Sequence, residues 1–249
     1  MNFKNALNWD EKTSRKAAEK VFINMAKNGA EWIKLLSMKP KDLDQLVTEF
    51  EGSEYLDEYV ASGKGGIFLA SHFGNWELMA AILSFKGYGG SVIARRIYFH
   101  KYDKIITGIR NRFGVKVFYR DGSLKKILRF LGGGDFLGIL ADQDVDSVEG
   151  VFVDFFNKPA YTPTAPVKIA MVSKSDLIPI FLVRKPDNTH KLIVEKPIKV
   201  FVEGDKESAV KNYTQKWSYI LEGYIKRYPE QWVWIHERWK TSPESIKTT

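Results

Sequence analysis

His72 and Glu77 stand in the segment Ser-His-Phe-Gly-Asn-Trp-Glu, where four residues separate a possible base from a carboxylate. The apolar run at 67–70 predicts a buried strand, and 76–85 predicts a helix. A histidine at the carboxyl end of a strand, with a carboxylate in the next helical turn, can be a general base whose ring that carboxylate orients. We therefore interpret His72 as a candidate base and Glu77 as its orienting partner.

The residues between them suit an oxyanion site. Gly74 permits a tight turn, and Asn75 can cap the helix that follows. The N-terminus of that helix directs free N–H groups and a positive dipole end toward the space beside His72. A histidine near a helix start is also common in cores and on surfaces, so the spacing alone leaves both interpretations open.

Composition limits the classes of protein. The 249 residues are enough for one domain with a sizeable core, and we expect a single domain over 1–249. Cysteine is absent, which excludes disulfides, thiolate metal sites and a cysteine nucleophile. The net charge of +8 favours anionic partners, but no basic block marks a nucleic-acid tail, so we expect no nucleic acid partner. No signal peptide and no run of about 20 apolar residues is visible, which predicts a soluble or peripheral protein.

The order of elements predicts an α/β fold. Helical patterns at 11–36 and 41–61 predict a helical N-terminal extension over 1–62. Beyond it, short apolar runs alternate with helical segments, which is typical of a mostly parallel central sheet flanked by helices. The predicted strands are 67–70, 91–94, 115–119, 136–141, 177–183, 191–194 and 198–201, and the predicted helices are 76–85, 101–113, 123–131, 163–172 and 207–227.

Further polar residues follow these strands, at the edge where ligands bind in such sheets. Arg95 and Arg96 suit a phosphate or thioester oxygen, or a solvated surface. Asp142 and Asp144 can accept hydrogen bonds from sugar hydroxyls, position an arginine or shape a turn. Two aspartates two residues apart without a nearby histidine make a poor metal site, so we expect no metal.

Two other arginines are candidates. Arg110 lies on the helix predicted over 101–113 and suits either substrate contact or internal pairing with Asp142 or Asp144. Arg238 lies in a C-terminal segment rich in tryptophan and is the better candidate there for a contact with a lipid head group.

Ordered motifs along the chain resemble one family. His72-Phe73-Gly74-Asn75-Trp76-Glu77 matches the His-x4-acid signature of the lysophospholipid acyltransferase superfamily, in the form found in lipid A biosynthesis (lauroyl/myristoyl) acyltransferases. The other matching segments are Arg-Asn-Arg-Phe-Gly at 110–114, Leu-Ala-Asp-Gln-Asp at 140–144, Phe-Phe-Asn-Lys-Pro-Ala at 155–160, Leu-Ile-Pro-Ile-Phe at 177–181 and Trp-Ile-His-Glu-Arg-Trp-Lys at 234–240. The stretch beginning Arg95-Arg96-Ile97 keeps the arginine of the family's Arg-Pro-x-x-Asn but neither its proline nor its asparagine.

The resemblance implies an enzyme that moves a fatty acyl chain from an acyl carrier protein thioester to a hydroxyl of a lipid A precursor. Acyl-CoA is an alternative donor, and no cofactor is implied. The partners would be acyl carrier protein, a phosphorylated glycolipid acceptor and an anionic membrane surface. The family's usual N-terminal membrane helix is absent from this sequence, so we expect a peripheral protein at the cytoplasmic face of the bacterial inner membrane.

Three other interpretations remain open at this point. The same chemistry can serve another acceptor, such as a lysophospholipid, an amino-acid lipid or a glycolipid. A non-catalytic module that binds anionic lipid or nucleic acid would need no role for Glu77. A metallohydrolase is disfavoured because the four histidines show no ligand spacing, and a Ser71 nucleophile lacks the Gly-x-Ser-x-Gly elbow.

Overall fold

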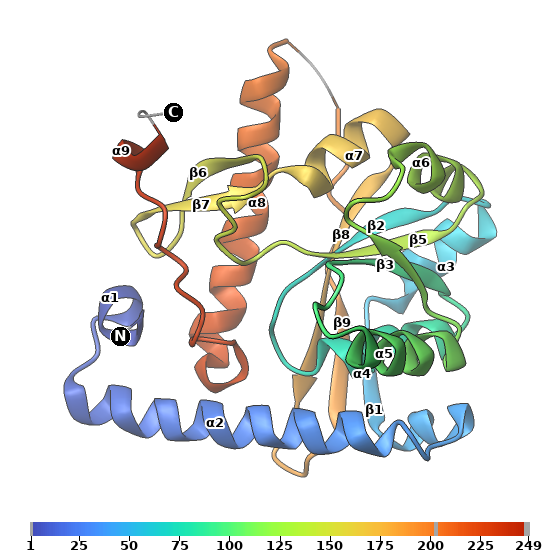
Figure 1. Ribbon diagram of the computed structural model, residues 1–249, viewed down its shortest axis with the longest axis horizontal. Coiled ribbons are helices and arrows are strands. Elements are labelled where there is room, and N and C mark those ends of the chain that lie inside the picture. Colours follow the sequence, from blue (N-terminus) through green and yellow to red (C-terminus); the bar gives the residue numbers. More distant parts are fainter. Residues whose placement is uncertain (1, 202–203, 247–249) are drawn as a thin grey trace.

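A seven-stranded sheet forms the centre of the protein in this computed structural model, which describes residues 2–201 and 204–246 (Figure 1). Neighbouring strands are parallel except β8 and β9, which are antiparallel. The predicted mixed α/β fold with a mostly parallel sheet is confirmed. In order across the sheet, the strands are β1 (Val47–Glu51), β9 (His190–Val194), β8 (Asp176–Arg184), β2 (Gly66–Ala70), β5 (Phe136–Leu140), β3 (Gly90–Ala94) and β4 (Lys116–Tyr119).

Helices cover both faces of this sheet. One face carries α3 (Ser53–Ala61), α4 (Trp76–Phe85) and α5 (His100–Arg112), and the other carries α6 (Leu124–Gly132), α7 (Ala165–Ser173) and α8 (Lys206–Arg227). Short 3-10 helices span Pro40–Gln45 and Pro229–Gln231, α1 (Asn2–Leu7) and α9 (Pro243–Ile246) lie near the ends, and β6 (Gly150–Asp154) and β7 (Pro159–Pro163) form an antiparallel hairpin.

The two helical layers explain the apolar strands. Along β2, Ile67 and Leu69 enter the core on the α8 side, whereas Phe68 and Ala70 enter the core on the α4 side. Every residue of β2 is buried, because both faces of the strand are covered. Because β2, β5 and β3 are parallel, their carboxyl ends share one edge of the sheet, and the loops that follow them emerge there.

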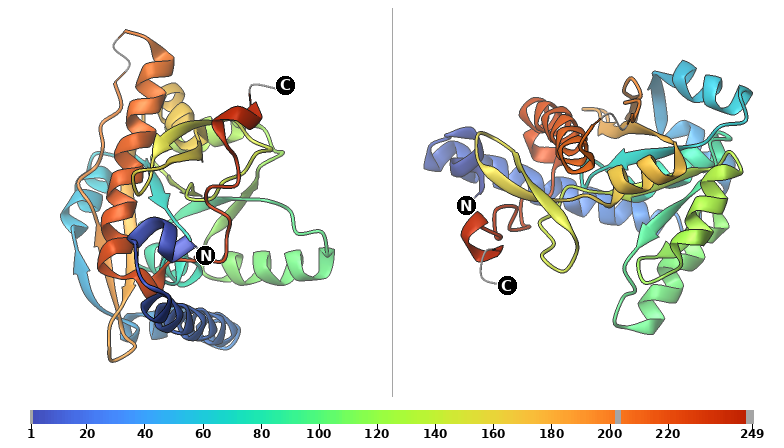
Figure 2. Two further views of the ribbon diagram at one scale, coloured as in Figure 1. Left: turned by 90° about the vertical axis from the view of Figure 1, so that its left-hand side faces the viewer. Right: turned by 90° about the horizontal axis from the view of Figure 1, so that it is seen from above.

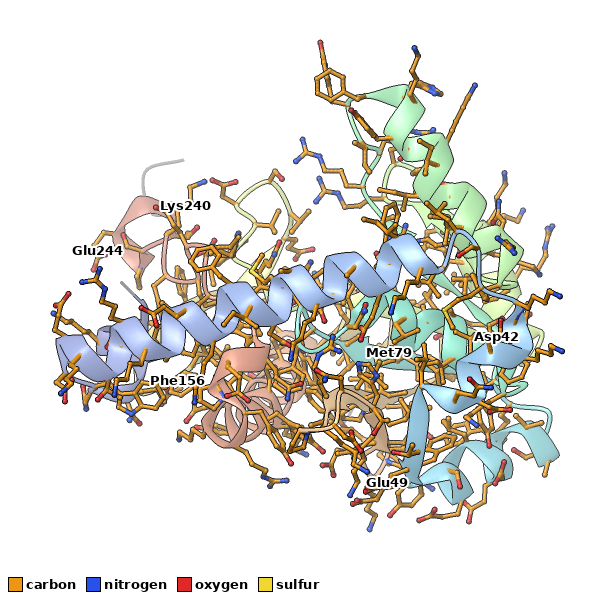
Figure 3. The ribbon with its side chains drawn as sticks, turned by 90° about the horizontal axis from the view of Figure 1, so that it is seen from below. Asp42, Glu49, Met79, Phe156, Lys240 and Glu244 are labelled. Carbon is orange, nitrogen blue, oxygen red and sulfur yellow. The ribbon has the colours of Figure 1, made fainter. Side chains whose placement is uncertain are left out.

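The long helix α2 (Glu11–Lys34) crosses the structure below the sheet and is fully visible from below (Figures 1 and 3). Arg184, at the end of β8, attaches it through hydrogen bonds to Asn24 (2.9 Å), Asn28 (2.6 Å) and Glu31 (2.8 Å). Arg184 follows its strand as His72 and Asp142 follow theirs, but its contacts fix α2 against the sheet.

Several predicted boundaries differ from the structure. The prediction of a helix over 41–61 is wrong at 47–51, because β1 joins the sheet edge beside β9. This strand, Val-Thr-Glu-Phe-Glu, is mostly polar and mostly exposed, so its sequence lacks the apolar run of an inner strand. The β6–β7 hairpin was not predicted, and Ile198 forms an isolated bridge with Leu177 rather than a strand. The division into domains stays a prediction.

No helix within residues 2–201 and 204–246 has the length and apolar content needed to span a bilayer.

Candidate active site

The backbone register places His72 and Asp142 side by side. Ala70 of β2 pairs with Leu140 of β5 in a parallel ladder, and each of the two candidates follows its strand by two residues. Parallel neighbours deliver their following loops to the same edge, so two residues 70 positions apart meet there.

Asp142 holds the imidazole of His72. Its Oδ1 lies 2.8 Å from His72 Nδ1, and its Oδ2 accepts hydrogen bonds from the His72 backbone N–H (2.9 Å) and from Trp232 Nε1 (2.8 Å). A carboxylate is an acceptor, so Nδ1 carries the hydrogen and Nε2 keeps its lone pair for an incoming proton. Asp142 is almost fully buried, while about a fifth of the His72 side chain, 22%, stays exposed.

The pKa values of both groups are displaced by this contact. Burial on its own lowers the pKa of His72, but the charge and hydrogen bond of Asp142 outweigh it, so the pKa is raised above its ordinary value. Burial likewise opposes ionisation of Asp142, yet the His72 ring and the hydrogen bonds from Trp232 and the His72 backbone lower the pKa of Asp142 overall. The pair is therefore built to keep a carboxylate beside a ring that readily accepts a proton.

The C-terminal segment after α8 supports the loop that carries His72. Trp232 bridges Phe73 in antiparallel fashion, Val233 N–H donates to the His72 carbonyl at 3.0 Å, and Gly74 N–H donates to the Gln231 carbonyl at 2.8 Å. Trp232 also packs against Phe155 at 5.7 Å between ring centroids. The orientation of the catalytic loop therefore depends on a segment about 160 positions further along the chain.

Glu77 does not hold the His72 ring, contrary to the sequence-based prediction. Its carboxylate accepts two hydrogen bonds from Arg110, at 3.0 Å from Nε and 2.6 Å from Nη2. The first turn of α4 directs Glu77 toward α5, whereas the ring of His72 turns back toward the end of β5. Glu77 still raises the pKa of His72 through its charge, after the larger effects of burial and Asp142. Its participation in catalysis stays a prediction.

Gly74 and Asn75 serve the backbone rather than a ligand. Gly74 adopts a φ of +57°, and a Cβ there would lie 1.8 Å from the Leu182 carbonyl oxygen, so only glycine fits. Asn75 caps α4, as predicted, by accepting from Leu78 N–H at 3.1 Å. Its amide nitrogen donates to Glu31 at 2.8 Å, so both ends of the side chain are engaged.

The helix end that Asn75 caps still suits an oxyanion. The first hydrogen bond along α4 runs from Met79 N–H to the Asn75 carbonyl, and the N–H groups of Trp76 and Glu77 precede it. Such N–H groups at a helix start lie at the positive end of the helix dipole. The Trp76 ring lies edge-on to the His72 ring at 5.0 Å, which places this end of the helix beside the candidate base.

The other predicted binding residues divide into exposed and buried groups. Arg95 is exposed at the end of β3 and has no hydrogen bond or ion pair within the described residues. Arg110 is bonded to Glu77 rather than to Asp142 or Asp144. Asp144 accepts hydrogen bonds from the backbone and hydroxyl of Thr241, at 2.8 and 2.6 Å, and so anchors the C-terminal segment.

Arg238 is a structural residue, which corrects its prediction as a lipid contact. It is 1% exposed, and its Nη1 and Nη2 donate to the Tyr161 carbonyl (2.6 Å) and the Thr162 hydroxyl (2.5 Å). Burial lowers the pKa of Arg238 to about 10, although the charges of Asp142 and Asp144 oppose the shift. A guanidinium enclosed in this way cannot reach a lipid head group.

A groove leads away from this site between α4 and the sheet. It is narrow and partly open to solvent, and Trp76, Glu77 and Arg110 lie at one end of its lining. The lining continues along the apolar side of α4 to Leu83, a distance of roughly 10 Å at the rise of a helix. Its floor includes Gly138, whose missing side chain leaves space. The further lining residues include Ala70, Met79, Ala80, Val92, Leu140 and Ile180.

Other chemistries receive no support from the geometry. The Ser71 hydroxyl is buried without a hydrogen-bond partner among the described residues, so no serine–histidine pair with His72 forms. In the part of the chain that the structure describes, no group of three or more histidine, aspartate or glutamate side chains is placed to hold a metal ion.

Trp232 is the site residue that sequence reasoning missed. It lies in the C-terminal segment rich in tryptophan, and its indole N–H donates to Asp142 Oδ2 at 2.8 Å. The sequence shows tryptophans alternating with polar residues in this segment. That pattern does not indicate which group an indole N–H contacts in the folded protein.

Comparison with known proteins identifies the family of this chain. Residues 6–241 match the family described as bacterial lipid A biosynthesis acyltransferase. A lipid A biosynthesis acyltransferase of Haemophilus influenzae is 27% identical over 235 residues, which cover 94% of this chain and 71% of the relative. The lauroyltransferase and myristoyltransferase of lipid A biosynthesis in Escherichia coli are 28% and 23% identical, over 80% and 83% of this chain and 64% and 63% of their own lengths.

The chain thus spans about two thirds of the length of these relatives. The match includes the loop with His72, the end of β5 with Asp142 and the groove between α4 and the sheet. The relatives are acyltransferases by name, and this chain belongs to the bacterial lipid A biosynthesis acyltransferases, a family of enzymes that transfer acyl groups.

Proposed function

We propose that this enzyme transfers a fatty acyl chain from the thioester of acyl carrier protein to a hydroxyl of a lipid A precursor. The observation that carries the proposal is the hydrogen bond from His72 Nδ1 to Asp142, which leaves the Nε2 lone pair available for a proton. Trp76, whose ring lies 5.0 Å from that of His72, lines the adjoining apolar groove. An acyl chain of this kind needs an apolar channel, and the acceptor hydroxyl needs a base.

In this mechanism His72 Nε2 takes the proton of the acceptor hydroxyl while the hydroxyl oxygen attacks the thioester carbon. Asp142 stabilises the imidazolium that forms and keeps the ring oriented. The resulting oxyanion is stabilised by the N–H groups and dipole at the start of α4. When the C–S bond breaks, the thiolate leaves and receives the proton from His72, so that no covalent enzyme intermediate is needed.

The Glu77–Arg110 pair has a different task in this proposal. It lies at the head of the groove with both side chains about four-fifths buried, at 20% and 18% exposure. The Glu77 carboxylate favours the imidazolium of His72, and its hydrogen bonds with Arg110 hold α4 against α5 at the entrance for the acyl chain. Glu77 therefore acts in this proposal as a positioning residue rather than as the partner of the base.

The partners follow from the basic surface. A net charge of +8 suits both an acidic acyl carrier protein and a phosphorylated glycolipid in an anionic leaflet. We place the protein as a peripheral protein at the cytoplasmic face of the inner membrane, with acyl-CoA as an alternative donor and no bound cofactor in the reaction.

The test is acyl transfer with purified protein, acyl carrier protein thioester and a lipid A precursor. We expect His72→Ala to lower turnover by about 10²–10⁴-fold, with a single cooperative unfolding transition as the control for folding. Turnover close to that of the wild type would rule out the base. Mass spectrometry of lipids from cells with and without the protein identifies the acceptor. A shift of one acyl unit in a lipid other than lipid A would keep the mechanism and replace the acceptor.

A further inference from the structure

The N-terminal end of α5 and the loop before it project from the body of the protein. Figure 2 shows this segment extending well beyond the sheet in both views, and Figure 3 shows it extending away from α2. It carries exposed apolar side chains that we call the aromatic tip, namely Ile97, Tyr98, Phe99, Tyr102 and Ile105. Tyr98 is 94% exposed and Phe99 63%. Large side chains exposed in one cluster are unusual on a soluble surface and indicate an interaction site.

The rings of the tip contact one another rather than the core. Tyr98 and Phe99 lie edge to face at 5.4 Å between ring centroids, and Phe99 and Tyr102 at 6.1 Å. The spacing of 99, 102 and 105 places three of the side chains on one face of the first helical turns. The aromatic tip therefore forms one continuous apolar surface patch.

Positive charge surrounds the tip. Arg95, Arg96, Lys101 and Lys104 are all exposed around it. The one carboxylate within the same stretch, Asp103, is buried and faces inward, where it accepts from Ile97 N–H at 3.1 Å and from the Tyr119 hydroxyl at 2.6 Å. The exposed charge of this stretch is therefore cationic, although Arg96 also contacts the exposed Asp121 at 3.4 Å.

The contacts of Asp103 also keep the tip ordered. They connect the loop before α5 to the helix itself and to Tyr119 at the end of β4. The guanidinium of Arg96 lies 3.8 Å from the centre of the Tyr119 ring, which fixes the base of the loop from the other side. A preformed tip loses little conformational entropy when it binds.

The tip leaves the sheet at the same edge as the active site. The loop before α5 follows β3, and β3 runs parallel to β5, which carries Asp142 at its end. A surface that receives the tip therefore faces the edge where His72 and Asp142 emerge. Aromatic side chains ringed by lysine and arginine are the composition that anchors proteins at the head-group level of membranes.

We propose that the aromatic tip inserts into the head-group region of an anionic lipid bilayer and so presents the active-site edge to a membrane-embedded acceptor. The inference rests on the proposed function only in naming what the docked site would meet. Arg95, Lys101 and Lys104 pair with lipid phosphates, and the rings and Ile97 enter the boundary between head groups and acyl chains. An acyl carrier protein is the other anionic partner, but it offers the rings no apolar layer to enter.

The first test is co-sedimentation with vesicles of phosphatidylcholine, with and without phosphatidylglycerol. We expect the wild type to bind anionic vesicles and Tyr98→Ser/Phe99→Ser to bind them at least about tenfold more weakly. Lys101→Gln/Lys104→Gln should weaken binding by about tenfold or more at low salt and less at high salt. The matched controls are Phe201→Ser/Tyr219→Ser and Lys206→Gln/Lys211→Gln, which remove the same kinds of exposed side chain away from the tip.

The second test uses the absence of cysteine from the chain. A single Tyr98→Cys variant carrying an environment-sensitive fluorophore should show a blue shift on addition of anionic vesicles, whereas the same label on Tyr219→Cys should not. Unchanged thermal unfolding of each variant establishes that the fold is intact.

Equal vesicle binding by the wild type and both tip variants would overturn the proposal. So would loss of acyl carrier protein binding by the tip variants with vesicle binding intact, since the tip would then be a protein-docking surface. The readouts separate this inference from the proposed chemistry. His72→Ala should bind vesicles normally and transfer acyl chains about 10²–10⁴-fold more slowly. The tip variants should keep transfer to a detergent-dispersed acceptor and lose transfer to one embedded in vesicles.

Discussion

The carboxylate of Glu77 and the guanidinium of Arg110 form a two-bond pair, at 2.6 and 3.0 Å, that joins the first turn of α4 to the last turn of α5. This pair leaves the His72 ring to Asp142. The motif His-x4-Glu therefore supplies two separate groups. His72 is the candidate base, and Glu77 joins α4 to α5 beside the groove.

The two carboxylates should differ in what their loss does to catalysis. We expect Asp142→Asn to lower kcat by about 10²–10⁴-fold, because the ring loses its oriented tautomer and its counter-charge. Glu77→Gln should lower kcat by only about tenfold, because the His72–Asp142 bond remains. Steady-state kinetics with one acyl carrier protein thioester provides the comparison. A loss in Glu77→Gln as large as that in Asp142→Asn, in a protein with unchanged unfolding, would make Glu77 the functional partner of His72.

The raised pKa of His72 predicts how activity depends on pH. Burial favours the neutral ring, but Asp142 outweighs it and favours the protonated one. Only the neutral ring can take a proton, so kcat/KM should rise with pH through a midpoint above the ordinary histidine pKa of about 6.5. In Asp142→Asn the midpoint should move to lower pH, since only the smaller effect of the Glu77 charge then opposes burial. A midpoint unchanged by Asp142→Asn would contradict the assignment.

The raised pKa of His72 also predicts that the free energy of unfolding decreases as pH rises, whereas activity increases. A ring whose pKa is higher in the folded than in the unfolded state stabilises the fold below about pH 6.5, and this contribution is lost as pH rises through the folded-state pKa. We expect the difference in the free energy of unfolding between wild type and His72→Gln to shrink from about pH 6 to about pH 9. Urea unfolding at both pH values measures it. Ser71→Ala, a neighbouring substitution that removes no charge, should show no such dependence.

Local patterns predicted much of this fold because they reflect local physics. The buried run at 67–70, the helix over 76–85 and its Asn75 cap were readable from apolar spacing and capping chemistry. The edge strand β1 was not, because an exposed strand needs no apolar run and its polar residues resembled a helix surface. The β6–β7 hairpin contains prolines at both ends of β7, which weakened any strand signal there.

The sequence predicted which edge of the sheet carries the candidate site, but not which side chains bond to one another there. His72 and Asp142 both follow strands, and this placed them at one end of a parallel sheet. Their direct hydrogen bond depends on the register of β2 against β5, and the sequence contains no local sign of that register. Arg238 was misassigned for the same reason. Its burial against the β6–β7 hairpin is a tertiary fact, invisible in a segment that alternates charged and aromatic residues.

The floor of the groove predicts how chain-length preference can be altered. A Cβ at Gly138 would meet Val92 Cγ1 at 3.4 Å and the Ser91 carbonyl oxygen at 3.5 Å, both ordinary contacts, so the backbone accepts a Cβ there and the further atoms of a larger side chain would narrow the groove. We expect Gly138→Val to lower kcat/KM for long acyl donors by about tenfold or more, with a smaller effect on short ones. Competition between donors of different length in one reaction measures the ratio. A parallel loss for every donor would show a folding defect instead, and an unchanged ratio would place the chain outside this groove.

Substitution of the buried Arg238 and of the exposed Arg95 should affect the free energy of unfolding differently. Arg238→Met removes hydrogen bonds to Tyr161 and Thr162 inside the protein, and we expect it to destabilise the fold by about 3 kcal/mol. Arg95→Ala should leave the unfolding midpoint unchanged, because Arg95 is exposed and has no partner within the described residues. If Arg95 contacts a phosphate of the acceptor, Arg95→Ala raises KM for that acceptor and leaves KM for the acyl donor unchanged. A stable Arg238→Met with a raised acceptor KM would instead restore Arg238 as a binding residue and show that its enclosure opens during the reaction.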